Sequence, residues 1–196
     1  MAPTTMMLLL FACAKASKLS PPAQLRAYEW PEQYHAVVVS NLTKRGGRLQ
    51  VIEMYYDWPR GHGINIVREQ LGGVLYNVEW TNGSSFLFDP AASTCRSFHF
   101  AVGILPPDWI AHGAVYHGRD TADGFDCHVW SNFLFQRYYA DIATGRPVRW
   151  IFNGITRHVL LFQKGRVIND SSKWQAPPYC FSNTTSGDVA SAPAPR

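Results

Sequence analysis

Residues 74–86 read VLYNVEWTNGSSF, and this stretch decides the fold class. Its apolar side chains occupy every second position, at Val74, Tyr76, Val78 and Trp80. A two-residue rhythm predicts a half-buried strand. Asn82-Gly83 follows where a type I′ turn needs two positive φ values, so we expect a β-hairpin with an exposed tip.

The same rhythm recurs along the chain. Phe98, Phe100, Val102 and Ile104 alternate with smaller or polar residues, which predicts another strand. Three further pairs of strands are expected, each around a Gly-containing turn: 34–42 with 49–56, 159–163 with 167–168, and the two halves of 138–152.

Helical patterns are rare. Residues 106–112, PPDWIAH, begin with prolines, carry Asp108 in the first turn and stop at Gly113, and residues 67–71 could form one more helical turn. We therefore predict a mainly β protein. Its expected form is a curved antiparallel sheet, a half-barrel of about eight to ten strands with one or two short helices.

The N-terminal region predicts export. Residues 6–14, MMLLLFACA, are too short to span a bilayer, and Ala14 and Ala16 fit a cleavage site, so residues 1–16 are expected to be a signal peptide. We expect a mobile segment at 17–27, a single β domain at 28–182 and a disordered tail at 183–196.

Glycosylation signals support the same compartment. Four Asn-x-Ser/Thr acceptors are present, at Asn41, Asn82, Asn169 and Asn183. The sequence therefore predicts a glycoprotein of the secretory pathway, destined for the extracellular space, the cell wall or the vacuole. No later stretch is long and apolar enough for a transmembrane anchor.

The amino-acid composition limits the classes of molecule that the protein is expected to bind. Apolar residues make up 46% and aromatic residues 14%, whereas charged residues reach only 16%. The formal charge of +4 is spread along the chain, which does not resemble a nucleic-acid-binding surface. The expected partner is a small hydrophobic ligand or a carbohydrate.

Cleavage after Ala16 would leave three cysteines and three possible pairings. We favour Cys95 with Cys180, because the irregular stretch around Cys180 needs a tether and closing so long a loop stabilises the fold. Cys127 is then expected to be buried or paired between chains.

Residues for catalysis or metal binding form only weak patterns. Glu53, Asp57 and Glu79 are candidate acids and bases for carbohydrate chemistry, although Glu53 and Asp57 would lie roughly 13 Å apart along one strand. Asp120, Asp123 and Asp126 are weak calcium candidates. Phosphate-loop and dinucleotide motifs are absent from the sequence, and we expect no cofactor.

Aromatic residues are the remaining unusual feature. Most should form the core, but a minority could line a concave pocket or stack on sugar rings. The candidate ligand-binding residues are Trp80, Phe98, Phe100, Ile104, Trp130 and Trp150.

Several motifs carry a family resemblance: YYDWPRGHGINIVREQLG (55–72), LYNVEWTNGSSF (75–86), FAVGILPPDW (100–109), DGFDCHVW (123–130), RPVRWIF (146–152) and WQAPPYCF (174–181). They resemble a plant family of uncharacterised secreted proteins, some loosely labelled glycosyl-group transferases. No Asp-x-Asp motif for a nucleotide sugar accompanies that label here.

More distantly, Cys95, ILPPDW, His117-Gly118 and the late Cys180 resemble the ependymin-related pattern, and YADIATGRPVR is similar to bacterial lipoprotein carriers of the LolA type. These resemblances imply a curved sheet around an apolar cavity. The favoured hypothesis is a binder of an apolar or amphipathic molecule such as a lipid. A carbohydrate-active enzyme and an extracellular structural or adhesion domain are the alternatives.

Overall fold

The computed structural model describes residues 29–181. The predicted signal peptide, the segment 17–27, Asn183 and the predicted tail lie outside the described residues.

The described part contains eleven strands and three 3-10 helices. The strands are β1 (Gln33–Asn41), β2 (Leu49–Asp57), β3 (His62–Glu69), β4 (Val74–Trp80), β5 (Ser84–Asp89), β6 (Thr94–His99), β7 (Val115–Ala122), β8 (Phe125–Ser131), β9 (Phe135–Asp141), β10 (Pro147–Phe152) and β11 (Ile155–Lys164). The 3-10 helices are η2 (Thr43–Arg45), η3 (Ser171–Trp174) and η4 (Pro178–Cys180).

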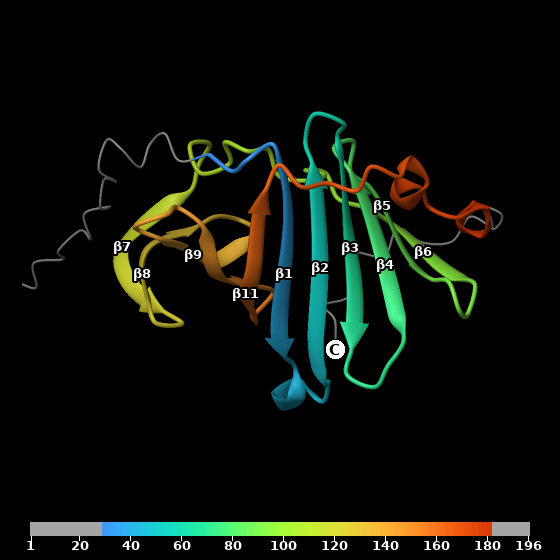
Figure 1. The fold of residues 1–196 in the computed structure, drawn as a ribbon, viewed down its shortest axis with the longest axis horizontal. Helices are drawn as coiled ribbons and strands as arrows, with labels where there is room; N and C mark the ends of the chain where they lie inside the picture. Colours follow the sequence, from blue (N-terminus) through green and yellow to red (C-terminus); the bar gives the residue numbers. More distant parts are fainter. Residues whose placement is uncertain (1–28, 182–196) are drawn as a thin grey trace, which may run out of the picture.

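All eleven strands belong to one open antiparallel sheet in the order β6-β5-β4-β3-β2-β1-β11-β10-β9-β8-β7. Two meanders, β1–β6 and β7–β11, meet where β1 pairs with β11 in the middle of the sheet. Figure 1 shows how the sheet curves away from this central pair. The predicted mainly β, curved antiparallel architecture is confirmed, with one strand more than the expected range.

Residues 100–114, here called the crossing segment, connect the two edge strands β6 and β7. The crossing segment packs Ile104, Trp109 and Ile110 into the protein interior. Two hydrogen bonds attach it to the N-terminal part of the chain. The Trp30 backbone amide donates to the Pro107 carbonyl at 2.8 Å. The Tyr56 hydroxyl of β2 donates to the Leu105 carbonyl at 2.8 Å.

The helix predicted for residues 106–112 is wrong, because the crossing segment forms only successive turns. The Pro107 carbonyl is bonded to Trp30 and cannot continue a helical ladder. The strand predicted to reach Ile104 is also too long, since β6 ends at His99. Gly103 there adopts φ +56° and lies against the backbone of Trp80 and Thr81.

Of the other local predictions, some are confirmed and some are wrong. The hairpins over 34–56 and 138–152 are confirmed as β1–β2 and β9–β10. Residues 67–69 belong to β3 rather than to a helical turn, and 167–168 form no strand. The β4–β5 hairpin is confirmed, but not as a type I′ turn: Gly83 has φ +88° and Asn82 is not among the positive-φ residues. This matches a longer loop with glycine in the left-handed position.

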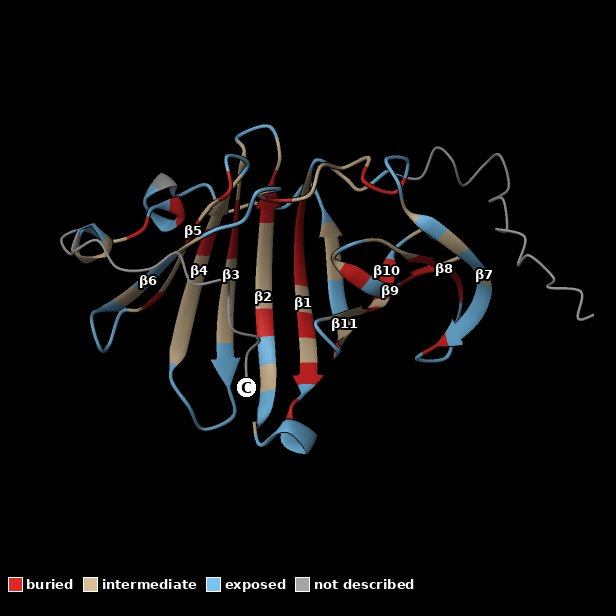
Figure 2. Cartoon of the chain, turned by 180° about the vertical axis from the view of Figure 1, so that it is seen from behind, coloured by how far each residue is buried: buried red, intermediate tan, exposed pale blue. Residues whose placement is uncertain are grey.

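The two faces of the sheet carry different cores. On the concave face, side chains from both meanders and the crossing segment form one cluster around Val38, Ile52, Trp130, Tyr138 and Trp150. The edge strands β6 and β7 are mostly exposed, as Figure 2 shows.

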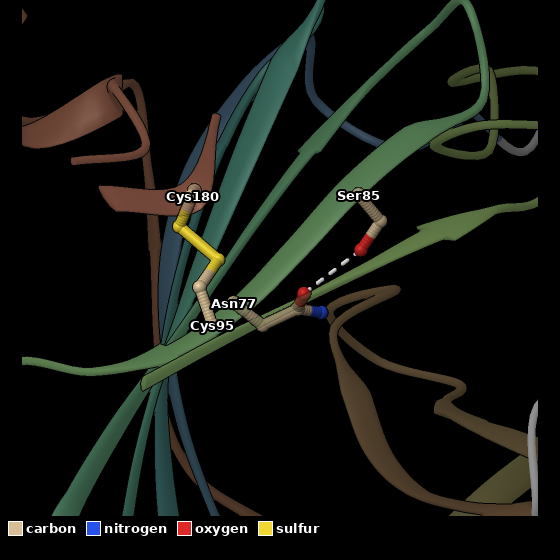
Figure 3. Close-up of a disulfide and its surroundings, with 4 residues drawn as sticks. All are labelled: Asn77, Ser85, Cys95 and Cys180. Atoms are coloured by element: carbon tan, nitrogen blue, oxygen red, sulfur yellow. Dashed lines mark hydrogen bonds between the residues drawn. A yellow bond between two sulfur atoms is a disulfide. The ribbon is translucent and has the colours of Figure 1, made fainter. Parts of the chain in front are cut away.

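The convex face of β3–β5 is covered by residues 165–181, here called the C-terminal segment. Trp174 and Ala176 pack against Ile64, Val78 and Phe88. The predicted disulfide is confirmed: Cys95 of β6 bonds to Cys180 of η4, with the Cα atoms 5.2 Å apart (Figure 3). Cys127 is a free, buried thiol, one of the two states expected for it.

Candidate functional site

A cavity of about 220 Å³ opens on the concave face of the sheet. This volume is far above the roughly 10–15 Å³ that one water molecule needs. Its lining comes from strands of both meanders and from residues 100–105 of the crossing segment. The cavity is therefore built by the whole fold, and its position depends on the curvature of the sheet.

Strand register brings five of the lining residues into one row across the sheet. Tyr34, Tyr56, Gly63, Glu79 and Ser85 are successive cross-strand neighbours from β1 to β5, and all five line the cavity. Directly opposed residues share one face of a sheet. Because Gly63 has no side chain, this row leaves room for Ile104 of the crossing segment, whose Cγ2 would lie 3.5 Å from a Cβ at Gly63.

Many of the residues that line the cavity are aromatic. Lining rings come from the N-terminal entry to β1, from three central strands, and from β9 and β10: Trp30, Tyr34, Tyr56, Phe135, Trp150, Phe152 and Phe162. Trp30 holds the cluster in place, since its indole Nε1 donates to the Tyr138 hydroxyl at 2.7 Å. Tyr34 stacks on Tyr56, with ring centroids 4.8 Å apart. These contacts pre-form an apolar surface.

One end of the cavity is polar. Its polar lining side chains, together with Asn77, which bonds to two of them without lining the cavity itself, are here called the polar end: Asn65, Asn77, Glu79, Ser85 and Arg157. The Asn77 amide donates to the Glu79 carboxylate, and the Ser85 hydroxyl donates to the Asn77 carbonyl oxygen at 2.9 Å. Figure 3 shows the bond between Asn77 and Ser85.

Electrostatics at the polar end are dominated by burial. Burial raises the pKa of Glu79, although Asn77, Arg157 and Asn65 oppose that shift. Burial also lowers the pKa of Arg157, and the charge of Glu79 opposes it. In both cases burial favours the uncharged form of the side chain, so the site disfavours a charged group that has no compensating partner.

The six candidate ligand-binding residues fall into two groups. Phe100, Ile104 and Trp150 line the cavity, as does Trp80, whose ring packs edge-on against Phe86 in the convex cluster. Trp130 and Phe98 do not line it.

These two residues have other surroundings. Trp130 is only 1% exposed in the concave core, and Phe98 on edge strand β6 lies beside Phe100, with Arg96 above its ring. Four of the six candidate ligand-binding residues therefore line the cavity.

The three candidate carboxylates do not converge. Glu79 lines the cavity, whereas Glu53 and Asp57 alternate with the cavity-lining Met54 and Tyr56 and so face the convex side.

Each of these two convex-side carboxylates is already engaged. Glu53 bonds to His35, Tyr55 and Arg68. Asp57 is fully buried and accepts from Gln33 at 3.0 Å and from Arg60 at 2.6 Å.

Two of the candidate calcium ligands also interact with other residues. The Asp120 side chain accepts from the Thr121 amide at 2.8 Å. Asp123 lies 2.8 Å from His158 and 3.5 Å from Arg149. Within residues 29–181, no group of three or more acidic, His or Cys side chains is arranged to hold a metal ion.

Sequence reasoning missed Gly63, Asn65, Asn77, Ser85 and Arg157. The alternation in β4 did contain a signal, because Asn77 and Glu79 share one face of the strand. The predicted acceptors Asn41, Asn82 and Asn169 are all exposed.

Residues 29–180 match the family described as "Domain of unknown function (DUF8395)". The chain belongs to DUF8395. No curated protein matches this DUF8395 chain. A solved crystal structure, that of an "uncharacterized conserved protein from Thermus thermophilus", is similar in fold, with a TM-score of 0.52 at 10% identity. The match covers 79% of the DUF8395 chain and 90% of the Thermus chain.

Two findings bear on the compartment of the DUF8395 chain. The Cys95–Cys180 disulfide fits an oxidising compartment. Among the helices of residues 29–181, none has the length and apolar character needed to cross a bilayer.

Proposed function

We propose that this protein is a secreted glycoprotein that binds an apolar or amphipathic small molecule, such as a lipid, in the cavity of its concave face. The observation that carries the proposal is a pre-formed aromatic cavity beside a small group of convergent polar side chains. Ligand sites are commonly concave and mostly apolar, with a few polar groups that fix orientation.

A binding role accounts for the site better than the alternatives. A glycosidase needs two carboxylates across one cleft, and of the three candidates only Glu79 lines the cavity. A purely structural or adhesion domain would be expected to fill its concave face with its own side chains. The cavity of about 220 Å³ on this face is contrary to that expectation.

The first test is mass spectrometry of organic extracts from protein purified natively from several hosts. A stoichiometric apolar or amphipathic compound is expected in at least one of them. Nile red, a neutral fluorescent probe, should also bind and gain intensity, and it should be displaced by the extracted compound. Protein that binds neither the probe nor any extracted compound would contradict the proposal.

A matched pair of variants ties binding to the cavity. A Cβ at Gly63 would meet only ordinary contacts, at 3.5 Å from Ile104 and from the Tyr55 carbonyl oxygen. Gly63→Ala should therefore fold and bind Nile red, whereas the larger side chain of Gly63→Leu should displace Ile104 or extend into the cavity and weaken binding about tenfold or more. Equal binding by both folded variants would place the probe elsewhere.

A further inference from the structure

We infer that the ligand carries a single carboxylate, which the Arg157 guanidinium holds at the polar end while the apolar body lies against the aromatic wall. This inference rests on the proposed function and adds the chemical class of the ligand. Its starting point is an arginine that the fold places inside the cavity.

Arg157 lies on β11 opposite Trp150, and both residues line the cavity. Its Nε atom is buried without a hydrogen-bond partner in the described part of the chain. Its guanidinium carbon lies 5.4 Å from the centre of the Phe152 ring, and the charge of Glu79 acts on it without a salt bridge between described atoms. A buried guanidinium with unused donors is costly unless something accepts from it.

The other members of the polar end do not provide that acceptor. Glu79 accepts from the Asn77 amide and the Asn77 oxygen accepts from Ser85, and the Arg157 Nε is bonded to neither of them. The Arg157 Nε donor therefore has no acceptor among the described residues. The site lacks an oxygen-bearing group placed along the N–H edge of the guanidinium.

Charge selects a carboxylate among such groups. A guanidinium matches a carboxylate through two parallel N–H···O bonds. A dianionic phosphate would leave uncompensated negative charge beside Glu79 in an apolar cavity. A carboxylate brings one negative charge, which matches the single positive charge of the guanidinium.

An alcohol or ester offers oxygen acceptors but no charge. It would leave the Arg157 charge uncompensated, so such ligands should bind through their apolar part alone.

The experiment compares octanoate with octan-1-ol by isothermal titration calorimetry on the full mature protein. The wild type should bind octanoate about tenfold more tightly than octan-1-ol, as expected for a charge-assisted pair. Arg157→Gln should remove this preference and leave the affinity for octan-1-ol within about twofold. Arg157→Lys, which keeps the charge but loses the two-pronged geometry, should be intermediate.

Arg149→Gln is the matched control. Arg149 is in the neighbouring strand β10 but interacts with Asp123 and the Tyr139 ring, and it does not line the cavity. Its removal should leave both affinities unchanged. If Arg157→Gln fails to fold by circular dichroism, the wild-type comparison and Arg157→Lys decide.

The outcomes separate the two proposals. Equal binding of octanoate and octan-1-ol to the wild type would overturn the carboxylate inference and leave the binding function intact. A preference that survives in folded Arg157→Gln would also overturn it. Failure of both compounds and of Nile red to bind would overturn the proposed function and this inference together.

Discussion

His62 stacks face to face on Trp174, with ring centroids 4.1 Å apart and ring planes 17° apart. This contact joins the first residue of β3 to the last residue of η3. Trp174 is only 3% exposed, and its indole Nε1 donates to the Ile168 carbonyl at 3.0 Å. The pair therefore attaches the C-terminal segment to the convex face, independently of the disulfide.

Replacing Trp174 by alanine should lower the free energy of unfolding by about 3 kcal/mol, because it empties a packed site and removes one hydrogen bond. Denaturant titration followed by circular dichroism measures this. Phe133→Ala is the control: Phe133 is 72% exposed, and its loss should change stability by less than about 0.5 kcal/mol. Equal effects of the two substitutions would contradict the role assigned to Trp174.

Acid should destabilise the protein through His62. Burial lowers its pKa below the ordinary 6.5, and the nearby charge of Arg60 lowers it further while Asp57 opposes. The unfolded chain thus takes up a proton first, so stability should decline as the pH falls from 6.5 through the lowered pKa. Thermal melting between pH 7 and pH 5 measures the decline.

His62→Phe keeps an aromatic ring on Trp174 but removes the proton site. It should reduce the pH dependence of melting in this range without abolishing it, because burial also lowers the pKa of His117 and of His128. An unchanged slope in this variant would show that His62 is not one of the groups responsible.

Loss of the disulfide should cost about 4–5 kcal/mol, since Cys95 and Cys180 close a loop with a sequence separation of 85 residues. The double variant Cys95→Ser/Cys180→Ser tests this by denaturant titration. Hydrogen exchange should accelerate most in the C-terminal segment, which loses its covalent link to β6. Uniform acceleration over the whole sheet would mean that this segment does not open separately.

Cys127 should resist alkylation in the folded protein. It is fully buried, and burial raises the pKa of its thiol to about 11, so almost no thiolate is present at pH 8. Peptide mapping after iodoacetamide should find Cys127 unmodified in the native protein and modified in guanidinium. Rapid native labelling would contradict the packing described for β8.

Strand β4 shows both the reach and the limit of sequence reasoning. Its two-residue rhythm correctly predicted a half-buried strand in an antiparallel sheet, and the spacing of turns predicted its neighbours. The rhythm cannot say which face is concave. Val78 packs against Trp174, so the apolar row faces the C-terminal segment and the row with Asn77 and Glu79 lies on the concave side.

The remainder of the site depends on contacts between distant parts of the chain. Gly63 of β3 and Arg157 of β11 are brought to one cavity only by the pairing of β3 with β2, of β2 with β1 and of β1 with β11. Likewise, the pattern of residues 106–112 satisfies helix rules locally, yet Trp30 captures the Pro107 carbonyl. A tertiary hydrogen bond or a close approach of two backbone segments can therefore override the local preference for a helix or a strand.

The pairing of β1 with β11 places Val38 opposite Val159. Each meander can assemble from hairpins between neighbouring strands, but this central seam must close a long loop, and such pairings slow folding. During synthesis, β1 therefore remains an unpaired edge until roughly 120 further residues have been made. Throughout that interval the nascent chain exposes an apolar strand that could recruit a chaperone or pair wrongly with a second nascent chain.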